Sequence, residues 1–123
     1  MRPAILGENM KKKELGNLGE EIAAQYLAQQ GYKIIARNLK LKKGEVDILC
    51  KDSENNLVLV EVKTCSKFSP VPAIENITRV KKNRLRRLWQ ELTSIYNCDN
   101  GYIMAIAIYY EGHETNIMAY ILD

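Results

Sequence analysis

Residues 44–64 of this chain read GEVDILCKDSENNLVLVEVKT. Two runs rich in valine, isoleucine and leucine, 45–51 and 57–64, flank five residues, 52–56, that all favour turns. Such runs form β-strands, and the polar cluster between them forms the connection. The sequence therefore predicts a β-hairpin.

The length of the predicted turn sets the register of this hairpin. If Lys51 faces Leu57, the charged residues face each other in two pairs, Asp47 with Glu61 and Glu45 with Lys63. Strand residues two apart share a face, so all four charged side chains are predicted to project on one side, at one end of the hairpin. The opposite face is predicted to carry apolar residues only: Val46, Ile48, Cys50, Val58, Val60 and Val62.

The predicted pair of opposed carboxylates calls for a cation. Like charges on facing strand residues destabilise a sheet, and half-buried carboxylates need a counter-charge or a proton. Magnesium prefers oxygen ligands and commonly binds one or two carboxylates. We therefore expect Mg²⁺ or Mn²⁺ at Asp47 and Glu61, with Lys63 placed to act on a phosphodiester and its attacking water. The alternative is a cross-strand network of ion pairs, in which Glu45 only holds Lys63.

Periodicity predicts the remaining elements. Apolar residues at helical spacing indicate helices over 11–30 and 78–96, the second with Thr78 as its N-cap. Strands are predicted over 32–41, 102–110 and 116–122, and a loop over 68–76. The order α-β-β-β-α-β-β predicts an α/β fold, a mixed sheet flanked by helices. All 123 residues are expected to form one domain, with residues 1–9 flexible.

Two glycines lie inside the first predicted helix. Gly16 and Gly19 each cost a helix about 1 kcal/mol relative to alanine. That cost predicts close packing of the helix against another element. Gly31 is expected to cap the helix at its C-terminal end.

Charge and composition narrow the class of protein. The chain has 18 basic and 15 acidic residues, a net charge of only +3. Its three cysteines form no C-x-x-C motif, and no apolar run reaches the ~20 residues of a membrane helix. We expect a cytoplasmic protein without a membrane partner. Basic residues cluster in the second predicted helix: Arg79, Lys81, Lys82, Arg84 and Arg86. They would either bind the phosphates of a nucleic-acid backbone or form a solvent-exposed helix face.

The hairpin also resembles a known nuclease signature. An acidic residue, a turn and then Glu-x-Lys form the core motif of the PD-(D/E)xK superfamily, matched here by GEVD at 44–47 and VEVKT at 60–64. Further motifs in the same order make the chain similar to the YraN family of Holliday-junction-resolvase-like endonucleases over residues 14–105. They are Gly16-x-x-Gly19-Glu20-x-x-Ala23, Tyr26-Leu27, Gly31-Tyr32, Ala36-Arg37-Asn38 and Thr78-x-x-Lys81.

The resemblance implies a restriction-endonuclease-like αβββαβ core and metal-dependent cleavage of DNA, rather than RNA, in branched or other non-duplex form. It implies metal ligation by Asp47, Glu61 and the backbone carbonyl of Val62, catalysis by Lys63, and an additional acid, Glu20. We keep Glu45 as a further catalytic candidate. It also implies a homodimer. Two alternatives stay open: a non-catalytic nucleic-acid-binding module of this fold, and a purely structural or interaction protein.

Overall fold

The structure is a computed structural model that describes residues 12–66, 79–98, 100–111 and 114–122. Its elements are α1 (Lys12–Gln29), β1 (Lys33–Leu41), β2 (Gly44–Lys51), β3 (Leu57–Ser66), α2 (Arg79–Tyr96), β4 (Gly101–Glu111) and β5 (Glu114–Leu122). The predicted order of elements is confirmed, with bounds that differ by a residue or two. The flexible start, the loop at 68–76 and the N-cap at Thr78 fall outside the described residues.

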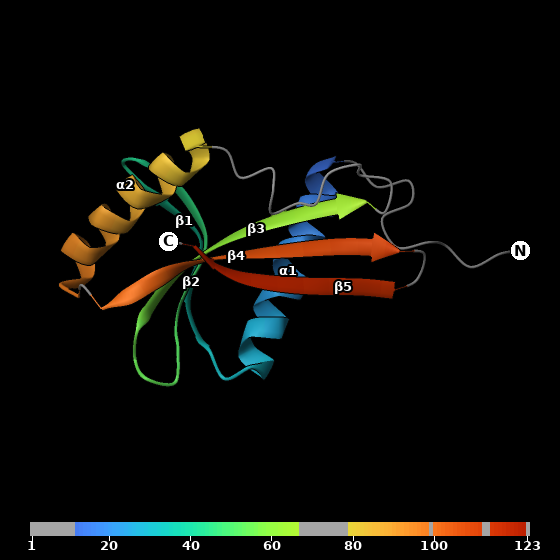
Figure 1. The fold of residues 1–123 in the computed structure, drawn as a ribbon, viewed down its shortest axis with the longest axis horizontal. Coiled ribbons are helices and arrows are strands. Elements are labelled where there is room, and N and C mark those ends of the chain that lie inside the picture. Colours follow the sequence, from blue (N-terminus) through green and yellow to red (C-terminus); the bar gives the residue numbers. More distant parts are fainter. Residues whose placement is uncertain (1–11, 67–78, 99, 112–113, 123) are drawn as a thin grey trace, which may run out of the picture.

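The strands form one mixed sheet. Their order is β1-β2-β3-β4-β5, which is also their order in the chain. Every neighbouring pair is antiparallel except β3 and β4, which run in the same direction side by side (Figure 1). A parallel pair needs a long crossover, and α2 lies in the segment that connects these two strands. The predicted α/β fold class is confirmed.

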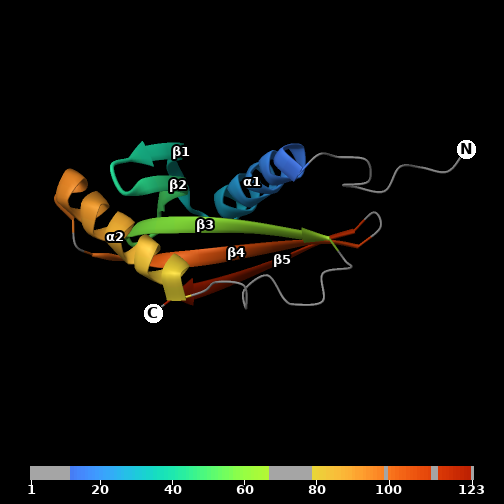
Figure 2. The same cartoon turned by 90° about the horizontal axis from the view of Figure 1, so that it is seen from above.

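The two helices cover opposite faces of the sheet (Figure 2). Helix α1 packs on the face that carries the β2 and β3 side chains Ile48, Cys50, Val58 and Val60. Helix α2 covers the other face, where Leu85, Leu88 and Leu92 meet Leu49, Leu57 and Leu59. The hairpin is therefore buried on both sides, as its apolar pattern predicts. No helix within the described ranges is long and apolar enough to cross a membrane.

The predicted hairpin register is confirmed in the half of the hairpin next to its turn, where Lys51 pairs with Leu57 and Ile48 with Val60. The ladder ends there, so the predicted pairing of Asp47 with Glu61 is wrong as a backbone pair. The predicted face of Val46 is also wrong, because Val46 packs with Leu49 on the α2 side and not with Ile48.

The break in β2 has a counterpart in β1. Pairing of the two strands continues on either side of Asp47 but skips Asp47 itself and Asn38, the residue that would face it. Asn38 adopts a left-handed backbone conformation, with φ of 51°. The register shift between the two strands lies at Ile34–Ala36, and the register is the same on both sides of Asn38, so the left-handed residue interrupts the pairing without inserting a residue. This irregularity reverses the expected alternation at Asp47, and the sequence pattern alone does not predict it.

Glycine brings α1 close to β3. A Cβ atom added at Gly19 would collide with the side chain of Thr64, so close packing is confirmed there. At Gly16 such a Cβ would meet no described atom within 4 Å beyond the adjacent residues and the backbone of its own helix, and the prediction is wrong for that residue. Gly31, two residues after the last residue of α1, has a φ of 94°, as expected for a C-terminal cap.

Candidate nuclease site

Asp47 lies where the two hairpin strands separate. Its Oδ2 atom accepts a hydrogen bond of 2.8 Å from the backbone N–H of Val62 in β3. The carboxylate therefore replaces the backbone partner that Val62 would have in a continued ladder. The N–H and C=O of a strand residue point to the same edge, so the Val62 carbonyl also opens toward Asp47.

Asp47 lies close enough to Glu61 for its charge to affect the ionisation of Glu61. Burial raises the pKa of Asp47 above its ordinary value of 3.8, and the Val62 N–H opposes that rise. Burial likewise raises the pKa of Glu61 above 4.5, and the negative charge of Asp47 raises it further. Two half-buried carboxylates, one of which disfavours the charge of the other, form an environment that a cation stabilises.

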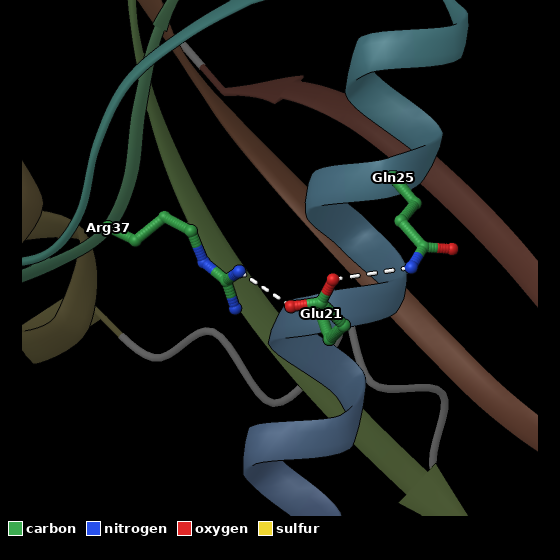
Figure 3. A network of polar contacts seen from close by, with 3 residues as sticks. All are labelled: Glu21, Gln25 and Arg37. Carbon is green, nitrogen blue, oxygen red and sulfur yellow. Dashed lines mark hydrogen bonds and ion pairs between the residues drawn. The ribbon is translucent and has the colours of Figure 1, made fainter.

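Glu20 brings a third carboxylate from α1. Burial raises its pKa, followed by the charges of Asp47 and Glu45, and a proton held on Glu20 is positioned to hydrogen-bond to Asp47. Its neighbour Glu21 lies on the exposed flank of the helix, where it binds Arg37 at 2.6 Å and accepts a hydrogen bond from Gln25 (Figure 3). Of these two adjacent acids, only Glu20 meets the hairpin carboxylates.

Glu45 has a different partner from the predicted one. The expected Glu45–Lys63 ion pair is absent from the described part of the chain, because the hairpin strands separate before they reach Glu45. Glu45 pairs along the backbone with Lys40 of β1 instead, and its side chain is exposed. It lies on the same side of the site as Glu20, whose pKa its charge raises.

Asn38 connects the two peripheral acids. With its nitrogen directed toward them, its side-chain amide donates to Glu20 Oε2 at 3.0 Å and to Glu45 Oε1 at 3.2 Å. Sequence reasoning missed this role, although Asn38 belongs to one of the motifs that carry the family resemblance. The preference of asparagine for left-handed turns offered a second signal.

Basic residues approach the acids from α2 and β3. The Nη2 atom of Arg84 forms an ion pair of 3.1 Å with Glu61 Oε1. The charge of Lys81 also lowers the pKa of Glu61. Lys63 is half-buried, follows Glu61 by two residues on the same strand face, and has no ion pair with a described residue.

The donor chemistry of this site suits a hard divalent cation. Asp47 and Glu61 supply carboxylate oxygens, and the Val62 carbonyl faces the same edge. The side chains are not yet arranged as a metal cage: in the described ranges, no three His, Cys, Asp or Glu residues are placed to hold an ion. Glu61 is bound to Arg84 instead. The ligand atoms are thus of the type that the ion prefers, and metal binding would require Glu61 to give up its ion pair with Arg84.

The predicted nucleic-acid contacts lie along the first half of α2. Lys82 and Arg86 are exposed there, Lys81 and Arg84 are half-buried, and the side chain of Arg79 lies outside the described residues. The basic surface is wider than predicted. The two carboxylate oxygens of Glu91 accept the backbone N–H groups of Lys42 and Lys43, which fixes the β1–β2 turn beside the helix.

A shallow surface groove follows from that contact. It is lined by residues of the turn and of α2: Lys42, Lys43, Arg87, Gln90, Glu91, Ser94 and Ile95. Sequence reasoning missed the two lysines, because a contact between residues so far apart in the chain leaves no local pattern. They extend the positive charge of α2 away from the acidic side chains.

Comparison with known proteins places the chain in a family. The family described as "Uncharacterised protein family UPF0102" matches residues 19–108. The chain belongs to this family. A UPF0102 protein of Caldicellulosiruptor saccharolyticus is 46% identical over 79 residues, which cover 64% of this chain and 66% of that relative. One of Trichlorobacter lovleyi is 32% identical over 84% of each chain.

Solved structures agree with the fold. A repair endonuclease from Pyrococcus abyssi superposes with a TM-score of 0.51 and 19% identity, covering 88% of this UPF0102 chain and 43% of the endonuclease. The chain thus spans less than half of that enzyme. At this identity the likeness shows the fold alone, and it agrees with the predicted α/β fold, a mixed sheet flanked by helices.

Proposed function

We propose that this UPF0102 protein is a metal-dependent endonuclease that hydrolyses phosphodiester bonds in DNA, in particular branched or other non-duplex DNA. The observation that carries the proposal is the half-buried pair Asp47 and Glu61, whose pKa values burial raises, with Lys63 beside it on β3. The fold is that of a protein described as a repair endonuclease, which supports the same class of reaction.

Asp47, Glu61, the Val62 carbonyl and Glu20 would hold Mg²⁺ or Mn²⁺ in this proposal. When bound, the ion neutralises the substrate phosphate and lowers the pKa of a coordinated water. Asn38 holds the carboxylates of Glu20 and Glu45 from the outer side, and so positions the acid that α1 contributes. Glu45 thereby acts on the site through Asn38 and through its charge.

Lys63 supplies a positive charge next to the reacting phosphate. Its ammonium group donates hydrogen bonds, so it orients the attacking water or stabilises the charge that develops on the phosphorus oxygens. Lys63 forms no ion pair with a described acidic residue, so the N–H groups of its ammonium are available to bind substrate. This role differs from that of Arg84, which Glu61 binds.

The basic residues of α2 would bind the DNA backbone. Lys81, Lys82, Arg84 and Arg86 lie on the helix that adjoins the acids, and Arg79 extends this series toward its N-terminus. Contacts of this kind neutralise phosphates without reading sequence, so the affinity should fall steeply with salt. We further propose that the protein acts in the cytoplasm and as a homodimer, since cutting a branched junction symmetrically needs two sites.

A non-catalytic DNA-binding module of the same fold is the second candidate. The ion pair between Arg84 and Glu61 favours it, because an acid that is already neutralised needs no metal. Such a module would bind DNA equally well with or without Mg²⁺.

Cleavage assays distinguish the two candidates. We expect the wild type to cut a panel of branched, single-stranded and duplex DNA in Mn²⁺ or Mg²⁺ but not in EDTA. Lys63→Ala should reduce the rate by roughly two orders of magnitude, as expected for loss of a group that acts on the transition state. Lys33→Ala is the matched control, because Lys33 is exposed and pairs with Lys51 at the far end of β2. Equal rates for all three proteins, or no cleavage of any substrate, would exclude the catalytic proposal.

A further inference from the structure

Arg84 occupies a position between the acids and the basic surface. Its Nη2 atom lies 3.1 Å from Glu61 Oε1, and its charge lowers the pKa of both Asp47 and Glu61. Its Nη1 atom lies 3.8 Å from the position that a Cβ atom would take at Gly44, at the start of β2. The guanidinium group thus reaches from α2 to the carboxylates of Asp47 and Glu61.

The exposures of the two partners differ. The Glu61 side chain is 17% exposed, whereas that of Arg84 is 36% exposed. The carboxylate is therefore fixed in a half-buried strand position, and the long arginine side chain is the partner with room to move. Leaving Glu61 without any counter-charge is costly, so the arginine leaves only when another cation replaces it.

We propose that Arg84 takes the place of the metal ion in the metal-free protein, where it neutralises the Glu61 carboxylate. When a divalent cation binds to Glu61, Arg84 leaves this carboxylate and binds a DNA phosphate instead. This inference rests on the proposed function. It adds that metal and Arg84 compete for one carboxylate, and that the metal thereby makes a phosphate-binding group available.

The chemistry of the two states is consistent with this exchange. Arginine binds carboxylates and phosphates with the same planar set of donors, so the released guanidinium suits a phosphodiester. Metal and DNA should then bind with positive coupling, because each favours the state in which Arg84 has left Glu61. Such coupling is reciprocal: DNA must tighten metal binding by the same factor.

Calorimetric titration with Mn²⁺ tests the competition directly. We expect Arg84→Gln to bind Mn²⁺ roughly three- to tenfold more tightly than wild type, since partly buried ion pairs exceed exposed ones in strength. Arg87→Gln is the matched control, with the same charge change one turn along α2 on an exposed residue. It should change Mn²⁺ affinity less than twofold, which separates release of Glu61 from a general effect of charge.

Binding of a synthetic four-way DNA junction, followed by anisotropy with and without Ca²⁺, tests the second half of the exchange. Ca²⁺ should tighten DNA binding of the wild type and of Arg87→Gln by similar factors. In Arg84→Gln the gain should be several-fold smaller. Equal gains in all three proteins would overturn the release of Arg84 to phosphate.

The outcomes separate this inference from the function on which it rests. If wild type and Arg84→Gln bind Mn²⁺ equally well, the competition is wrong and the metal site stands. If neither binds Mn²⁺, both proposals fail. A second measurement needs no variant: the Nε–H signal of Arg84 in NMR spectra of the wild type should shift on Mg²⁺ addition, and an unchanged signal under saturating Mg²⁺ would also overturn the exchange.

Discussion

Asp47→Asn is expected to reduce DNA cleavage by roughly a hundredfold or more and, at the same time, to make the metal-free protein more stable at pH 7. Activity falls because the amide removes one of the two negative ligands that the cation needs. Stability rises because the amide carries no charge into a half-buried position. The substitution is also conservative, since the Asn oxygen still accepts the hydrogen bond from Val62 that Asp47 Oδ2 accepts at 2.8 Å.

The sign of the stability change follows from the pKa of Asp47. Burial raises that pKa in the folded protein above the ordinary 3.8, so at pH values between the unfolded and the folded pKa the folded state binds more protons than the unfolded state. The protonated carboxyl of Asp47 therefore contributes stability in full below about pH 3.8, and this contribution is lost as the pH rises through the pKa of Asp47 in the folded protein. At pH 7 the ionised Asp47 therefore destabilises the fold, and asparagine relieves this cost.

Thermal unfolding in EDTA at pH 7 and pH 4 measures this effect. We expect Asp47→Asn to unfold at a higher temperature than wild type at pH 7, and the difference to shrink at pH 4. Glu21→Gln is the control, because Glu21 is exposed and bound to Arg37 rather than to the other acids. It should keep full activity and gain no stability. An Asp47→Asn protein that cleaves DNA normally, or that is less stable than wild type at pH 7, would contradict the role given to this residue.

Gly19→Ala is expected to destabilise the protein by about 1–3 kcal/mol, the usual cost of overpacking a close contact. The added Cβ would collide with the Thr64 side chain, which is β-branched and follows Lys63 on β3. Helix α1 would have to move away from the sheet, and Glu20, the next residue, would move with it. We therefore expect weaker metal binding in addition to a lower free energy of unfolding.

Gly16→Ala in the same helix is the matched control. A Cβ at Gly16 would meet no atom of another described element within 4 Å, so alanine should stabilise the helix by about 1 kcal/mol through its propensity alone. Chemical denaturation of the two variants gives the comparison. If both substitutions change the free energy of unfolding in the same direction, the close approach of α1 to β3 is not a determinant of stability.

Local patterns were enough to predict the architecture. Alternating apolar residues and the turn at 52–56 gave β2 and β3 with their register from Ile48 to Lys51, and both faces of that hairpin are buried as expected. The helices followed from their periodicity. Each of these features depends on residues that are neighbours in sequence or in one strand pair, where sequence reasoning is strongest.

The details of the site depend on contacts that no local pattern records. The left-handed backbone of Asn38 interrupts the pairing opposite Asp47, so strict alternation gave the wrong face for Val46 and an ion pair at Glu45 that does not form. Arg84 was predicted to bind nucleic acid, and its contact with Glu61 became visible only once α2 was placed on the sheet.

Calorimetric titration of Mn²⁺ into four proteins tests most directly whether residues 47 and 61 share a cation. Wild type and Glu21→Gln should bind Mn²⁺ with the same affinity, whereas Asp47→Asn and Glu61→Gln should each lose roughly tenfold or more, since even loss of a residue that only orients a ligand typically costs that much. Indistinguishable titrations for all four proteins, or no heat of binding in the wild type, would contradict a shared divalent cation at this site.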